Sequence, residues 1–405
     1  MGISRLRLGR SPESSVSPTS PTAGGDGFGT VRLLAAFAII VDHTAPLTRT
    51  GGSVLPSAFG VDLGVIAVAA FMAMSGYHVT RSWERDPSAW RFAVRRTLRI
   101  VPGLVVVLLA AAFVLGPLLT TLPLRDYLGH PKTFSYLTNN LQLFPQQYAL
   151  PGVFTGNPYP NAVNGSLWSL PVEVLGYAIV LAAGLFGLLR RRFVLVLAAV
   201  VFAAAFQRIL TRQIVPPKTL LMIPTAPLLQ YLAVYCVGMA AYLYRDRIRF
   251  SWAGVLICVG IDVVMHGSAM AEIVRLVTVP YVVLTIGELL PRRLWLPSWL
   301  TVASYGVYLY GFPTEQAVLH VGVRSPMMVA LVAVPIALAL GLLSWHVVES
   351  PAMKLRRYLF RRGRTRPARA PAAAVAPATS AAPPAAAAPA AAPAVQPLPA
   401  SATAP

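Results

Sequence analysis

Residues 99–120 read RIVPGLVVVLLAAAFVLGPLLT, an apolar stretch in which Arg99 is the single charged residue. About 20 apolar residues in a helix cross the hydrocarbon core of a bilayer, which is about 30 Å thick. The whole chain has the same character, since 56% of its 405 residues are hydrophobic and 12% are charged. A soluble domain carries about 25% charged residues. The composition therefore excludes a soluble globular protein and predicts an all-α, polytopic integral membrane protein.

Ten apolar segments along the chain are candidates for membrane-spanning helices. They are residues 28–47, 59–79, 99–120, 167–189, 193–210, 225–244, 251–266, 271–290, 299–319 and 326–348. Segment 251–266 is short and contains Asp262. Segment 28–47 is interrupted by Arg32, Asp42 and His43.

The basic residues indicate how these segments are oriented. The chain has 34 basic and 14 acidic residues and a net charge of +20. With the N-terminus inside, 26 of the 34 basic residues fall on the inner side and 8 on the outer side. Short cytoplasmic loops carry the excess of Lys and Arg in membrane proteins. We therefore expect both termini in the cytoplasm, and the charge predicts membrane topology and contact with lipid rather than nucleic-acid binding.

The two ends of the chain differ in composition from the apolar segments. Residues 1–27 are rich in Ser, Pro, Gly and Thr and contain no apolar core of a signal peptide, so we expect a flexible cytoplasmic leader. Residues 361–405 begin with basic residues and continue as Ala and Pro, which predicts a disordered tail. Residues 28–360 remain as the membrane domain. Cys236 and Cys258 lack the spacing of a metal site, so no metal is expected.

The longest predicted outer loop, residues 121–166, is rich in Tyr, Pro, Asn and Gln. Such a loop suits a sugar or another hydroxylated acceptor. A plain connecting loop explains the same composition equally well, so the loop alone does not choose between them.

His43 and Glu173 are ionisable residues predicted to lie deep in the membrane. A titratable side chain at such a depth is costly and is often functional. His43 follows Arg32 by 11 residues, which is about 16 Å along a helix. Glu173 lies about 10 Å below the outer start of its segment by the same rise. Imidazole is suited to accept a proton from a hydroxyl, and a carboxylate can stabilise the resulting cation. The two residues either share a pocket or are satisfied by separate neighbours, and Asp42 is expected to contact another span.

Arg96 and Arg99 lie at the inner start of segment 99–120, three residues apart, and so project to one side of a helix. Guanidinium groups bind phosphates through paired hydrogen bonds. The pair predicts a site for a phosphate-bearing donor. An ordinary cytoplasmic anchor that contacts anionic lipid is the alternative.

Four stretches together resemble acyltransferase family 3, the membrane O-acyltransferases of bacteria. They are VRLLAAFAIIVDH (31–43), AFMAMSGYHV (70–79), RFAVRRTLRIVP (91–102) and NGSLWSLPVEVLGY (164–177). The last carries the W-S-L-x-x-E signature at Trp168, Ser169 and Glu173. VVESP at 347–351 is a weaker similarity. The chain departs from the family pattern at Met72, where a second Phe is common.

The resemblance implies transfer of an acyl group, often acetyl from acetyl-CoA, to a hydroxyl of a sugar, glycolipid or macrolide-like product. It implies that His43 is the proton acceptor, that Glu173 is the signature carboxylate, and that Arg96 and Arg99 bind the donor. Arg32, Asp42, Trp168 and Ser169 are supporting candidates. A transporter or flippase for a polysaccharide or lipid unit is the alternative function.

Overall fold

The computed structural model describes residues 26–50, 62–215, 217–220 and 223–361, apart from the side chains of Arg357 and Arg361. The predictions of a flexible leader and of a disordered tail fall almost entirely outside these residues.

A helix occupies each of the ten predicted segments. These helices are α1 (Gly27–Thr48), α2 (Leu63–Arg85), α3 (Ala89–Ala110), α7 (Ser169–Leu185), α8 (Phe193–Leu210), α9 (Thr225–Leu243), α10 (Trp252–Met265), α11 (Ala271–Leu289), α13 (Ser304–His320) and α14 (Pro326–Ser344). Within the described residues, seven helices are long and apolar enough to cross a membrane. The chain is thus an all-α polytopic membrane protein, as predicted, while the count of ten spans and the side of the termini stay predictions.

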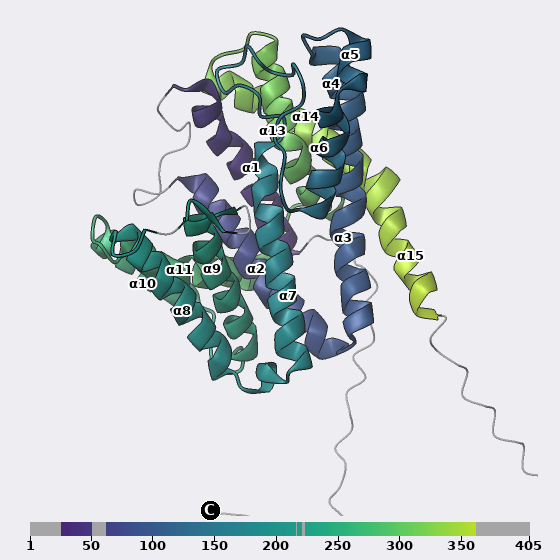
Figure 1. Cartoon of the computed structure of the whole chain (residues 1–405). Helices are drawn as coiled ribbons and strands as arrows, with labels where there is room; N and C mark the ends of the chain where they lie inside the picture. The colour runs from purple at the N-terminus through teal and green to yellow at the C-terminus, as the bar shows by residue number, and fades with distance from the viewer. Residues whose placement is uncertain (1–25, 51–61, 216, 221–222, 362–405) are drawn as a thin grey trace, which may run out of the picture. The chain divides into compact units, whose positions relative to one another are not determined.

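Two of these helices continue through a π-helical turn into a further helix. Helix α3 passes through η1 (Ala111–Leu115) into α4 (Gly116–Leu119), and α14 passes through η5 (Trp345–Glu349) into α15 (Ser350–Arg361) (Figure 1). The predicted outer loop contains α5 (Leu124–Gly129), α6 (Pro131–Gln142) and the short 3₁₀ turn η2 (Gly165–Trp168).

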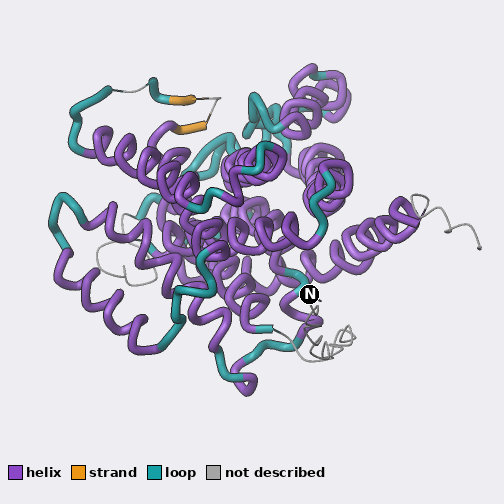
Figure 2. The backbone as a smooth tube through the Cα atoms, turned by 90° about the horizontal axis from the view of Figure 1, so that it is seen from below, coloured by secondary structure: helices purple, strands orange, loops and turns teal. Residues whose placement is uncertain are grey.

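The other short elements connect the long helices. They are η3 (Leu188–Arg190), β1 (Thr219–Leu220), β2 (Ile223–Pro224), η4 (Arg292–Leu294) and α12 (Ser298–Thr301). The antiparallel pair of β1 and β2 is the only sheet in the described part of the chain, and Figure 2 shows helices joined by loops elsewhere.

Helices α2 and α9 pack closely because each presents a glycine to the backbone of the other. A Cβ atom at Gly76 would lie 2.2 Å from the carbonyl oxygen of Tyr235, and one at Gly238 would lie 2.2 Å from that of Ala73. Small residues at helix contacts permit such approach in membranes. Helix α1 contacts α2, α13 and α14, so side chains from all four helices can meet along its length.

Candidate functional site

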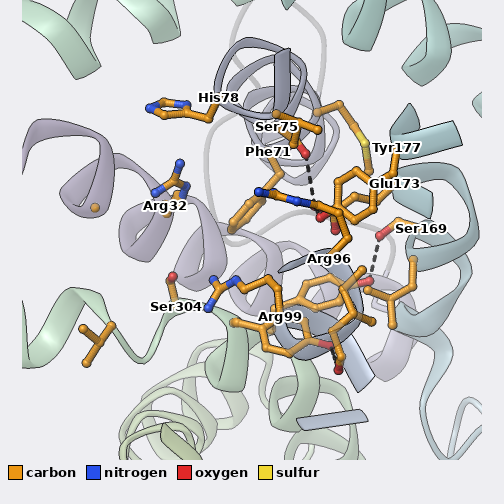
Figure 3. A pocket seen from close by; sticks show the side chains of 18 of the residues that line it. Arg32, Phe71, Ser75, His78, Arg96, Arg99, Ser169, Glu173, Tyr177 and Ser304 are labelled. Atoms are coloured by element: carbon orange, nitrogen blue, oxygen red, sulfur yellow. Dashed lines mark hydrogen bonds between the residues drawn. The ribbon is translucent and has the colours of Figure 1, made fainter. Parts of the chain in front are cut away.

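A cavity of about 420 Å³ lies beside the first turns of α1, at the end of the bundle predicted to face the cytoplasm. Helices α1, α2, α3, α7, α13 and α15 contribute to its wall. Its cationic lining is Arg32, Arg95, Arg96, Arg99 and Arg356. Arg32, Arg96 and Arg99 approach the same space from two helices (Figure 3). So dense a positive lining would attract an anionic ligand.

Arg96 and Arg99 line this cavity together, as their spacing predicts. The Arg96 guanidinium lies 5.7 Å from the ring centre of Phe92 and 5.5 Å from that of Tyr177, and its Nη2 donates to Oγ of Ser82 at 3.2 Å. Arg99 lies 5.2 Å from the ring centre of Tyr305. Cation–π contacts of this kind hold a guanidinium in place, so the two side chains are positioned before any ligand arrives.

Arg99 and Arg95 also have carboxylate partners. Nη1 of Arg99 is 3.6 Å from Oε2 of Glu349, a buried residue of η5. Nη1 of Arg95 is 2.5 Å from Oδ2 of Asp86. Arg95 is therefore neutralised by a close partner, which leaves Arg96 as the cavity arginine of α3 with no ion pair among the described residues.

Glu173 lines the same cavity from the first turns of α7 and is held by two hydroxyl groups. Ser75 Oγ donates to its Oε1 at 3.1 Å, and the Tyr177 hydroxyl donates to the same oxygen at 2.6 Å (Figure 3). Ser75 belongs to the SGY stretch of α2 and Glu173 to the W-S-L-x-x-E signature. The structure thus joins two motifs that are far apart in the sequence.

His43 does not meet Glu173. Its Nδ1 lies 3.6 Å from Oε2 of Glu315 on α13, and its ring packs edge-on against Phe312 with 5.5 Å between the centres. The carboxylate next to the predicted base is therefore Glu315. Of the two alternatives for His43 and Glu173, a shared pocket or separate neighbours, the structure shows separate neighbours. Depth counted along each helix predicted similar levels for the two residues, but Glu173 lines the cationic cavity together with Arg32, near the start of α1, whereas His43 lies 11 residues further along that helix.

Glu315 is completely buried, and neither of its oxygens has a hydrogen-bond partner among the described residues. A buried carboxylate is costly unless it is paired, and His43 is the group that faces it. Glu315 is one of the ionisable residues within the predicted spans, but no spacing links it to His43. Sequence reasoning therefore had no signal for this contact.

His43 lies one helical turn beyond the cavity. Ile39 lines the cavity wall, and residues four apart share a helix face. Arg32, Ile39 and His43 thus form one stripe along α1, with the cation at the predicted inner end and the imidazole at the other. The His43 side chain is 23% exposed.

Trp168 and Ser169 are consecutive in the signature but face different spaces. Ser169 lines the cationic cavity, and its hydroxyl is 2.8 Å from that of Tyr308. Trp168 lines a second cavity, at the opposite end of α1. The predicted contact of Asp42 with another span is also present, because its carboxylate lies against Gly64 in the first turn of α2.

Several cavity residues were not singled out from the sequence. His78 was attributed to a span end, yet it lines the cavity with its ring 4.4 Å from that of Phe28. Glu349 does not line the cavity itself but pairs with Arg99 there; it lies in the VVESP stretch, and that similarity was the available signal. Arg356 was counted among the inner cations only.

A family model described as an acyltransferase domain, that of acyltransferase family 3, matches residues 26–346. The chain belongs to acyltransferase family 3. An O-acetyl transferase of Shigella phage Sf6 is 28% identical over 338 residues, which cover 80% of this chain and 94% of that protein. Nodulation protein 10 of Rhizobium leguminosarum bv. viciae is 26% identical over 383 residues, which cover 86% of this chain and 99% of that protein. No solved structure matches.

Membership of acyltransferase family 3 makes the protein an acyltransferase and sets the transporter alternative aside. Both the cationic cavity and the His43–Glu315 pair lie in residues matched by the family, except for the part of the cavity built by α15. Among the described residues, no group of three or more His, Cys, Asp or Glu side chains is arranged to hold a metal ion.

Proposed function

We propose that this family 3 acyltransferase moves an acyl group from acyl-CoA to a hydroxyl of a sugar, glycolipid or small product. The acyl group that we propose is acetyl. The proposed location is the inner membrane of a bacterium, with the donor entering from the cytoplasm. The observation that carries the proposal is the single stripe of α1 that leads from the cationic cavity at Arg32 to the imidazole of His43. The similarity to an O-acetyl transferase of Shigella phage Sf6 supports the same chemistry.

Coenzyme A carries phosphates, and the cavity offers guanidinium groups to bind them. Arg96 and Arg99 would hold the phosphates near the cytoplasmic opening, since charge-assisted bonds to guanidinium are strong and directional. The acyl-bearing arm would then extend along α1 past Ile39 toward His43. Glu173 accepts hydrogen bonds from Ser75 and Tyr177. It would therefore hold these side chains in place as part of the wall of this passage.

The transfer needs one proton acceptor. The acceptor hydroxyl oxygen attacks the thioester carbonyl carbon while His43 takes the hydroxyl proton. The carbon–sulfur bond breaks as the new ester forms, and the coenzyme thiolate leaves and takes up a proton. Glu315 faces Nδ1 of His43 and would stabilise the imidazolium that exists between these proton transfers. The other ring nitrogen, Nε2, would receive the proton.

The direct test is acyl transfer by membranes that contain the full-length protein. With ¹⁴C-acetyl-CoA and cell-envelope lipid or polysaccharide as acceptor, label should enter the acceptor as a base-labile ester. The His43→Ala protein, inserted at the same level, is the matched control. Failure of wild-type membranes to consume acetyl-CoA, together with no acetyl-sized mass difference in the acceptor, would refute the proposal.

A further inference from the structure

Glu349 is a buried carboxylate that lies behind one of the cavity arginines. Its side chain is 1% exposed, and its Oε2 lies 3.6 Å from Nη1 of Arg99. Its other oxygen, Oε1, accepts a hydrogen bond from Oγ of Ser344 at 3.2 Å. A buried carboxylate without a compensating charge is costly, so Arg99 stabilises Glu349 in this position. The proposed transfer gives Glu349 no part.

The segment that carries Glu349 forms part of the cavity wall. Trp345, at the start of η5, and Met353 and Arg356, in α15, all line the cationic cavity. Glu349 ends η5 and lies between them in the chain. Turns of π-helix are rare and often occur at functional sites. The position of Glu349 is thus set by an element that faces the proposed donor site.

The ion pair of Glu349 with Arg99 leaves the hydrogen-bond donors of the guanidinium available. Charge-assisted N–H···O bonds measure about 2.7–2.9 Å, whereas the separation here is 3.6 Å. Oε2 of Glu349 accordingly has no hydrogen-bond partner among the described residues. A guanidinium has five N–H donors, and the Arg99 side chain is 34% exposed. Arg99 can therefore bind an anion in the cavity while Glu349 stays beside it.

The other cavity arginines of α3 are arranged differently. Arg95 donates a hydrogen bond of 2.5 Å to Asp86, so its charge is bound to a close partner. Arg96 has no ion pair with any residue that the structure describes. Arg99 is intermediate between them, because its charge is compensated but is not used in a hydrogen bond to the carboxylate.

A phosphate bound to Arg99 would be attracted by the guanidinium and repelled by the carboxylate behind it. The energy between two charges falls only as the inverse of their distance, and the effective dielectric constant of such a site is about 20. A carboxylate that lies farther from the phosphate than the guanidinium therefore cancels part of the attraction. The net attraction remains, but it is weaker than that of an arginine with no counter-ion.

Tyr305 holds Arg99 in place independently of Glu349. The guanidinium lies 5.2 Å from the centre of the Tyr305 ring. The Tyr305 hydroxyl donates to the carbonyl oxygen of Ile100 at 2.9 Å, and the residue is buried. Loss of the Glu349 charge should therefore change the electrostatics of the cavity more than the position of Arg99.

We infer that Glu349 is the resident counter-ion of Arg99 and limits the affinity of the cationic cavity for coenzyme A. This inference rests on the proposed function, because it concerns the donor of the same transfer. In the empty cavity Glu349 compensates Arg99 and reduces the repulsion among the arginines. When the donor or the product coenzyme occupies the cavity, Glu349 weakens its binding, which speeds release after each transfer. Glu349 acts through Arg99 and contacts neither reactant.

Binding of coenzyme A tests this role without an acceptor. The full-length protein in detergent is titrated with ³H-labelled coenzyme A, and the Kd is measured. Glu349→Gln keeps the size of the side chain and removes its charge, so the Kd should fall about fivefold relative to wild type. Glu349→Met, which is of similar length and uncharged, should lower the Kd in the same way and serves if the glutamine variant misfolds. A purely structural role cannot give this result, because damage to the site would weaken binding.

Glu84→Gln is the matched control. Glu84 pairs with Arg245 across the same distance of 3.6 Å, but both side chains are 38% exposed and neither residue lines the cavity. Its variant has the same net charge as Glu349→Gln and should bind coenzyme A like the wild type.

An unchanged or higher Kd in the folded Glu349 variants would overturn the role of Glu349 and leave the proposed function standing. An equal fall of the Kd in Glu84→Gln would show an effect of net charge and would also overturn it. If the wild-type protein binds no coenzyme A, the proposed function and the inference are refuted together.

Discussion

Nδ1 of His43, on α1, faces Oε2 of Glu315, on α13, across 3.6 Å. The carboxylate is fully buried and the imidazole is partly exposed. One ring nitrogen is thus directed at a buried carboxyl group. This is the arrangement in which a histidine acts as a general base and a carboxylate holds it in place.

Removing either member of this pair should slow the chemical step. His43→Ala should lower the rate by about 10²- to 10⁴-fold, the usual contribution of a general base. Glu315→Gln keeps the size of the side chain and removes its charge, so we expect a loss of about tenfold or more. Both variants should change kcat and leave the KM for acetyl-CoA unchanged in an initial-rate assay.

Glu272→Gln is the control for the loss of a carboxylate. Glu272 pairs with Arg275 at 2.6 Å and lines neither cavity, so its variant should keep wild-type turnover. Full activity in Glu315→Gln with an inactive Glu173→Gln would return the base-supporting role to Glu173.

Arg96 and Arg99 should not tolerate lysine. A lysine keeps the positive charge but cannot form the paired bonds of a guanidinium with phosphate. We expect Arg96→Lys and Arg99→Lys to insert normally and to raise the KM for acyl-CoA about tenfold, the effect of losing one charged hydrogen bond. Arg91→Lys is the control, since Arg91 is an exposed arginine of α3 that lies outside the cavity. If all three variants behave alike, Arg96 and Arg99 are only topological anchors.

Arg356 should contribute to donor affinity although it lies beyond the residues matched by the family. It lines the cationic cavity from α15 together with Met353. Because Arg356 is exposed at the opening, its attraction for phosphate is screened by water, and Arg356→Ala should raise the donor KM about threefold. Lys354→Ala, on the same helix but outside the cavity, should have no effect. Equal effects of both variants would indicate a general charge effect of α15.

The contact of α2 with α9 should depend on its glycines. Gly76→Ala and Gly238→Ala each place a methyl group against the backbone of the other helix, and such overpacking costs about 1–3 kcal/mol. Gly260→Ala, in α10, meets no atom within 4 Å and should be neutral or slightly stabilising. Thermal unfolding in detergent measures all three, and equal Tm values for them would contradict the close packing described here.

Cysteine labelling of intact cells can test which loops lie on the cytoplasmic side of the membrane and which lie on the outer side. With Cys236 and Cys258 replaced by Ala, Lys132→Cys in the first turn of α6 should react with a membrane-impermeant maleimide. Arg191→Cys, between α7 and α8, should react only after the membrane is opened. Both positions are exposed in the structure. The reverse pattern would invert the topology and place the cationic cavity on the outer face.

Local features of the sequence were enough to predict the helices and one part of the site. Membrane thickness determines how long an apolar helix must be, so segments such as 193–210 are recognised by length and composition, and α8 spans those residues. The spacing of Arg96 and Arg99 places both on one helix face, and the structure shows both in one cavity. These predictions need only the geometry of a single helix.

The partner of His43 was decided by the tertiary structure alone. The rise per residue gives depth in the membrane, but which helix lies beside α1, and how each is rotated, follows from packing between distant segments. Close helix contacts, such as those of Gly76 with Tyr235 and of Gly238 with Ala73, belong to the packing between distant segments that brings Glu173 to Ser75 and Glu315 to His43. The division of Trp168 and Ser169 between two cavities arises in the same way, because neighbouring residues on a turn point in different directions and only the surrounding helices determine what each one meets.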